Sequence, residues 1–192
     1  MSGRLAVVVA LVGGCVLDLP PPLEPDGCDG PPVPCGTRCI PPEDVCAPTD
    51  FAGRYSVTVR SGTNACELEG WMEGSVVDAP VSVTQDGTDL SLRVEGIAGF
   101  LLALDFFAEP VFVGTVEGDT FEARSATTRQ LTEGGCAWRN APSIRAEATG
   151  ENTVEGVLEY RIEANGHPDC PPFFDECVST QSLVASRPPP VP

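Results

Sequence analysis

Apolar and polar residues alternate in one stretch after another between residues 51 and 187, which restricts this part of the chain to extended structure. In RYSVTVR, Tyr55, Val57 and Val59 fall on one side of the chain, as in a strand with one buried face. The same period continues through PVSVTQDGTDLSLRVEG, PVFVGTVEGDTFEAR and SIRAEATGENTVEGVLEYRIEA, where central turn residues favour hairpins. About eight strands with short connections predict an all-β fold, an antiparallel up-and-down barrel, with a β-sandwich as the alternative.

A barrel of this size is either filled by its own side chains or leaves room for one small ligand. We expect apolar side chains of the alternating pattern to line a small cavity, and the candidates are Tyr55, Val57, Leu92, Phe121, Leu158 and Tyr160. The segment IAGFLLALDFF at residues 97–107 does not alternate. It fits a strand buried on both faces, a short helix that plugs the barrel, or an exposed apolar patch facing a ligand or partner.

The chain has nine cysteines in 192 residues, and so many cysteines indicate either metal binding or disulfide bonds. No two of them form a Cys-x-x-Cys pair, and the single histidine, His167, cannot build a Cys/His zinc site. A zinc site of four cysteines in residues 28–46 is the alternative, but their spacing does not match the paired cysteines of zinc ribbons. We therefore expect disulfides, an oxidising compartment and no metal site. Residues 28–46 form a segment too short for a core of its own, which predicts a disulfide knot. Its four cysteines are Cys28, Cys35, Cys39 and Cys46.

The pairing of the other cysteines follows from strand register. If residues 144–149 and 153–162 pair across the turn at Gly150 so that residue numbers sum to about 302, Cys136 lies opposite residue 166 and close to Cys170. This register predicts a Cys136–Cys170 bond and leaves Cys66 to bond Cys177. The alternative is a local Cys170–Cys177 loop with Cys66 bonded to Cys136.

The first 14 residues, MSGRLAVVVALVGG, have the plan of a secretory signal, with Arg4 before an apolar run and two glycines before Cys15. The apolar run is too short to cross a bilayer, which takes about 20 residues. The segment resembles a bacterial lipoprotein signal, whose lipobox ends in a small residue and a cysteine. The resemblance implies cleavage before Cys15 and acylation of this residue with chains such as palmitate. An ordinary signal peptide or a buried strand is the alternative.

By the same resemblance, Val16 in place of an aspartate implies the outer membrane. An acylated Cys15 leaves eight cysteines, an even number that suits four bonds. Residues 15–27 are rich in proline and acids and predict an extended spacer, and residues 188–192 form a proline-rich tail.

Two further segments resemble known families. The piece CIPPEDVC resembles the centre of a low-density-lipoprotein receptor type A module. Residues 47–50, APTD, stand in place of the Asp-Gly-x-x-Asp-Cys stretch whose acids bind calcium in that family, so no calcium site is expected. Gly53-Arg54-Tyr55, with Arg187 near the end of the barrel segment, resembles the lipocalin arrangement in which an arginine caps a Gly-x-Trp strand. Tyr55 stands where lipocalins have tryptophan. The resemblance implies a lipocalin-like barrel.

Charge and motifs narrow the function. With 28 acidic and 11 basic residues the formal net charge is −17, which disfavours nucleic acid as a partner. His167 lies in the turn composition NGHPDC without a nucleophile motif, so a hydrolase using this residue is not favoured. We expect no catalytic residues and no cofactor. We expect a non-enzymatic, lipid-anchored envelope protein that binds a small apolar ligand. The alternative is a structural or adhesive module whose loops, including residues 170–177, contact another envelope protein.

Overall fold

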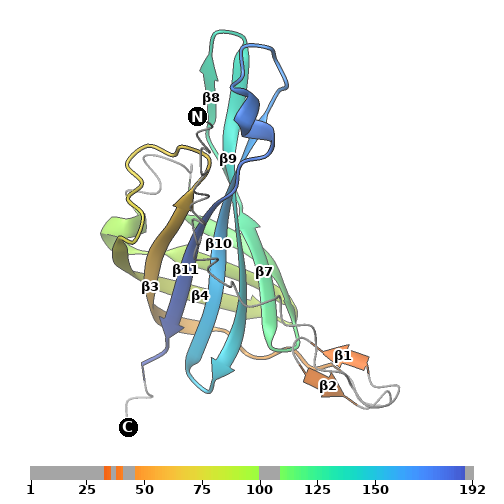
Figure 1. Cartoon of the computed structure of the whole chain (residues 1–192). Helices are drawn as coiled ribbons and strands as arrows, with labels where there is room; N and C mark the ends of the chain where they lie inside the picture. The colour runs from red at the N-terminus through yellow and green to blue at the C-terminus, as the bar shows by residue number, and fades with distance from the viewer. Residues whose placement is uncertain (1–32, 36–37, 41–45, 100–108, 189–192) are drawn as a thin grey trace, which may run out of the picture.

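Eight antiparallel strands close into a barrel in this computed structural model, which describes residues 33–35, 38–40, 46–99 and 109–188 (Figure 1). Each barrel strand pairs with its neighbours, and the last one pairs with the first. The prediction of an all-β, up-and-down barrel is confirmed. The barrel strands are β3 (Gly53–Asn64), β4 (Val76–Asp86), β5 (Asp89–Val94), β6 (Val111–Glu117), β7 (Thr120–Ser125), β9 (Cys136–Gly150), β10 (Thr153–Ala164) and β11 (Ser179–Ser186).

Three short strands and one short helix lie outside the barrel. Strand β8 (Gln130–Glu133) pairs with the first residues of β9 and projects beyond the barrel wall (Figure 1). Strands β1 (Val33–Cys35) and β2 (Arg38–Ile40) form a hairpin within the predicted knot. The 3-10 helix η1 (Pro172–Asp175) lies in the connection between β10 and β11.

The two ends of the barrel differ in their connections. Three two-residue turns, at residues 87–88, 118–119 and 151–152, lie at one end, which we call the closed end. Gly87 and Gly118 have φ values of 61° and 58°, the left-handed conformation that tight hairpin turns require. The other end, which we call the loop end, carries the long connections, including residues 65–75 and 165–178.

Burial follows the period of two that the sequence shows. Along β3, Tyr55 and Val57 are buried while Arg54, Ser56 and Thr58 are exposed. No charged side chain of the described barrel strands is buried, so the interior is formed by apolar and uncharged polar groups. Residues 96–99 are helical, and the rest of the non-alternating segment up to residue 107 lies outside the described residues.

The strand register brings the barrel cysteines together as predicted. In the β9–β10 pair Leu158 lies opposite Ile144, and the structure forms the bonds Cys136–Cys170 and Cys66–Cys177. The first bond ties the connection at residues 165–178 to β9, and the second joins this connection to the one at residues 65–75. A third bond, Cys35–Cys46, lies in the knot. The predictions for residues 1–14 and 15–27, for Cys15 and Cys28, and for the tail beyond residue 188 fall outside the described residues, as does the side chain of Cys39.

Candidate ligand cavity

Arg187 seals the closed end by packing on Tyr55. Its Cζ lies 5.2 Å from the centroid of the tyrosine ring, and its Nη2 donates to Tyr55 Oη at 2.6 Å and to the carbonyl of Asp50 at 3.1 Å. Gly53 has a φ of 145°, and a Cβ there would lie 3.3 Å from Arg187 Nε. This is the arrangement that Gly53-Arg54-Tyr55 and Arg187 led us to expect.

Phe51 closes the barrel floor from inside. Its side chain is 2% exposed and meets Phe121 edge to face, with ring centroids 5.1 Å apart. Gln85 holds this segment in place, because its Oε1 accepts from the Phe51 N–H at 2.8 Å and its Nε2 donates to the Thr49 carbonyl at 3.0 Å. The Tyr55 hydroxyl donates to the Phe51 carbonyl at 3.1 Å. These hydrogen bonds therefore fix residues 49–51 across the closed end of the barrel.

Above this floor the barrel interior contains an apolar cavity of about 60 Å³. Every barrel strand contributes to its wall. The Tyr55 hydroxyl is engaged by Phe51 and Arg187, so the tyrosine presents its ring to the space. The lining residues are Phe51, Tyr55, Val57, Val81, Val83, Leu92, Val94, Phe112, Phe121, Ile144, Val154, Leu183 and Ala185.

The structure places four of the six predicted cavity residues, Tyr55, Val57, Leu92 and Phe121, on this wall. The other two, Leu158 and Tyr160, are buried in the same core but do not line the cavity. The prediction missed Phe51, which precedes the first strand and therefore carries no strand signal of its own. It also missed eight wall residues that lie in strands, among them Leu183 and Ala185, which the alternation in STQSLVASR could have identified.

A chain of uncharged polar groups lies beyond the cavity, toward the loop end. Gln181 Nε2 donates to Ser61 Oγ at 3.0 Å, and Ser75 Oγ lies 3.1 Å from the same oxygen. The Tyr160 hydroxyl donates to Gln181 Oε1 at 3.2 Å. Burial raises the pKa of Tyr160 above its ordinary value, so its hydroxyl stays protonated and acts as a donor. Trp71 packs edge to face on this tyrosine at 5.5 Å.

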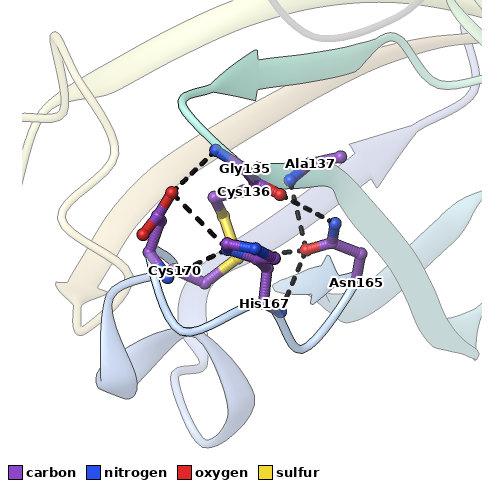
Figure 2. Close-up of polar contacts among 7 residues, drawn as sticks. Gly135, Cys136, Ala137, Asn165, His167 and Cys170 are labelled. Atoms are coloured by element: carbon purple, nitrogen blue, oxygen red, sulfur yellow. Dashed lines mark hydrogen bonds and ion pairs between the residues drawn. A yellow bond between two sulfur atoms is a disulfide. The ribbon is translucent and has the colours of Figure 1, made fainter.

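His167 takes part in a separate cluster around the Cys136–Cys170 bond (Figure 2). Its Nδ1 accepts from the Asp169 N–H at 3.2 Å and lies 3.5 Å from Asp169 Oδ2. That carboxylate oxygen also accepts from the Gly135 N–H at 2.8 Å. The imidazole covers Gly135 so closely that a Cβ there would lie within 2.7 Å of three ring atoms.

Asn165 completes the cluster between β9 and the β10–β11 connection. Its Oδ1 accepts from the Ala137 and His167 N–H groups, both at 3.2 Å, and its Nδ2 donates to the Gly135 carbonyl at 3.0 Å (Figure 2). The half-exposed His167 ring thus contacts the backbone at Gly135 and the neighbouring Asp169. These contacts hold the β8–β9 hairpin to the connection between β10 and β11.

Within the described part of the chain, no group of three or more His, Cys, Asp or Glu side chains is placed to hold a metal ion. The helices of that same part include none long and apolar enough to cross a membrane. No family model matches the sequence, and no curated protein sequence matches it. Among solved structures, similarity is found to a chain described as "Structure of EF1p2_mFAP2b bound to DFHBI", with a TM-score of 0.39 and 8% identity. The similarity covers 72% of this chain and 94% of that one.

Proposed function

We propose that this protein is a non-enzymatic, lipid-anchored component of the cell envelope, and that a small apolar molecule binds in the cavity of its barrel. The observation that carries the binding proposal is a space of about 60 Å³ bounded by apolar side chains from all eight barrel strands. Cavities of this kind stay dry and take up small apolar molecules. An occupant would restore the packing contacts that the lining groups lack.

The size of the cavity limits the ligand. An engineered cavity of about 150 Å³ holds one benzene molecule, and the space here is about 60 Å³. The cavity as it stands therefore has room for a few heavy atoms. Benzene, 1-hexanol and longer molecules therefore bind only with displacement of wall side chains. The loop end is the side from which they enter, because Phe51 and Arg187 seal the closed end.

The envelope assignment has separate support. The lipobox-like segment ending at Cys15 implies a lipid anchor, and disulfides persist in oxidising compartments. The described residues contain three disulfides. The net charge of −17 repels anionic headgroups, so attachment would depend on the acyl chains. The intact mass of membrane-extracted protein, with and without reduction, tests this assignment. An unmodified N-terminus or free thiols in a cytosolic protein would contradict it.

Methyl-resolved NMR tests ligand binding. Benzene and 1-hexanol are titrated into the oxidised protein, and the methyl signals of Val57, Leu92 and Leu183 report from the cavity wall. Val157 and Val184, which are 42% and 47% exposed, serve as internal controls on the outer surface. We expect saturable shifts confined to the wall residues. Equal shifts at the controls, or no shifts at all, would contradict the proposal.

One observation favours the alternative function, a structural or adhesive module. The barrel is largely filled by its own side chains, since a closed barrel of eight strands leaves only about 60 Å³. In that case the loops around Cys170 and Cys177 would contact another envelope protein. An unresponsive cavity, combined with a defined protein partner that co-purifies from membranes, would support this function over ligand binding.

A further inference from the structure

The strands carry their inward-facing polar groups immediately beyond the apolar wall. Gln181 lies two residues from Leu183 on β11, and side chains two residues apart point to the same face of a strand. Gln181 also lies opposite Ser61 on β3, as Leu183 lies opposite Val59. Two residues of strand span about 7 Å, so the polar pair lies about that far along the strand from the end of the cavity wall.

The polar pair has hydrogen-bonding capacity for a ligand. A primary amide has two N–H donors, and one of those on Gln181 bonds Ser61 Oγ. The other can donate to an incoming oxygen. The Ser61 hydroxyl accepts from Gln181 and lies within 3.1 Å of Ser75 Oγ, so it too can exchange a partner. Both groups are uncharged.

No cation faces this space among the described residues. The barrel strands bury no charged side chain in the part of the chain that the structure describes. Arg187 packs on the Tyr55 ring at the closed end and is not part of the cavity wall. An ionised carboxylate entering the barrel would lose its hydration without gaining a charged partner, which is strongly unfavourable. The net charge of −17 opposes an anion further.

We propose that the cavity selects uncharged amphipathic molecules, short-chain alcohols, amides or esters, whose apolar part lies against the wall near Leu183 and whose oxygen meets Gln181 and Ser61. This inference rests on the proposed ligand-binding function. It assigns the specificity of that site to two residues that do not line the cavity itself. It also predicts discrimination between molecules of equal chain length that differ in headgroup charge.

A headgroup comparison tests the selectivity. 1-Hexanol and hexanoate are titrated at pH 7.5, where the carboxyl group is ionised, and the methyl shifts of Val57 and Leu183 are followed. We expect hexanoate to bind at least tenfold more weakly than 1-hexanol. Hexanoate binding as tightly as 1-hexanol would overturn the inference while leaving ligand binding intact. If neither compound nor benzene shifts the wall methyls, the proposed function itself fails.

Variants test the two residues. Gln181→Leu removes the amide, and Ser182→Leu places the same side chain on the exposed face of the same strand as a control. We expect Gln181→Leu to weaken 1-hexanol binding several-fold while benzene binding stays within twofold, and Ser182→Leu to change neither. Ser61→Ala, a smaller change, tests the same site if Gln181→Leu fails to fold. Unchanged 1-hexanol affinity in both Gln181→Leu and Ser61→Ala would refute the assignment.

Discussion

Filling the cavity should stabilise the barrel. Val83 and Val154 line it and are 7% and 6% exposed. Val154→Ile adds one methylene to the interior, and burying a methylene contributes about 0.8 kcal/mol. Filling the whole space sets the limit, because a cavity of about 60 Å³ costs about 1.4 kcal/mol at about 24 cal/mol per Å³. We therefore expect the Val83→Ile/Val154→Ile variant to gain about 1 kcal/mol and no more than this limit.

The assay is urea unfolding of the oxidised, ligand-free protein, with thermal unfolding as a second measurement. A gain of about 1 kcal/mol corresponds to a rise in Tm of about 4 °C for a domain of this size. Val157→Ile is the matched control, since it lies on the same strand and is 42% exposed. The control introduces the same β-branched side chain without filling the cavity, and we expect it to change stability by less than about 0.5 kcal/mol.

Two results would refute this reasoning. If Val154→Ile destabilises the protein by about 1 to 3 kcal/mol, the site is already filled, because that is the usual cost of overpacking. If Val157→Ile stabilises as much as Val154→Ile, the gain comes from strand propensity. The stabilised variant should also bind benzene more weakly, because the space is occupied. Unchanged benzene binding would place the ligand elsewhere.

Three further predictions concern the loop end. Burial raises the pKa of Tyr160, so the unfolded chain loses this proton first, and the stability from this group is complete below about pH 10 and falls above it. We expect Tyr160→Phe to flatten this decline in the free energy of unfolding, measured by urea unfolding at alkaline pH. An unchanged slope would contradict the prediction. Gly135→Ala should cost about 1 to 3 kcal/mol by crowding the His167 ring, and additivity with His167→Ala in a double-mutant cycle would exclude that cause. Replacing Cys66 and Cys177 by alanine should lower stability by about 5 kcal/mol, since the bond spans 111 residues; a loss below about 1 kcal/mol would argue against the bond.

Much of the fold could be predicted because burial on one face of a strand enforces a period of two. The register of β9 and β10 follows from the turn near Gly150, and with it the position of Cys136 near Cys170. Apolar residues that alternate within a strand, such as Tyr55 and Val57, were also placed correctly on the cavity wall. In each case a local pattern carries the information.

The parts that could not be predicted depend on contacts between distant segments. Phe51 reaches the interior because Gln85, 34 residues away, holds its backbone N–H. The alternation in its strand places Gln181 on the same face as Leu183, but its hydrogen bond with Ser61 depends on the pairing of β11 with β3. Strand β8 is exposed at every position, so it has no alternation from which to predict it. Such features can be recognised only once the positions of the strands in the closed barrel are known.

The cavity and the disulfides have opposite effects on the stability of the barrel. This connects the two parts of the proposed function, ligand binding and location in the cell envelope. An interior void lowers the stability of a barrel. The void costs about 1.4 kcal/mol at about 24 cal/mol per Å³, whereas loops of 34 and 111 residues closed by disulfides contribute about 4 and 5 kcal/mol by constraining the unfolded chain. The bonds therefore offset the void by a wide margin. A barrel that keeps such a binding site is better tolerated in an oxidising compartment than in a reducing one, so loss of ligand binding on reduction should accompany unfolding.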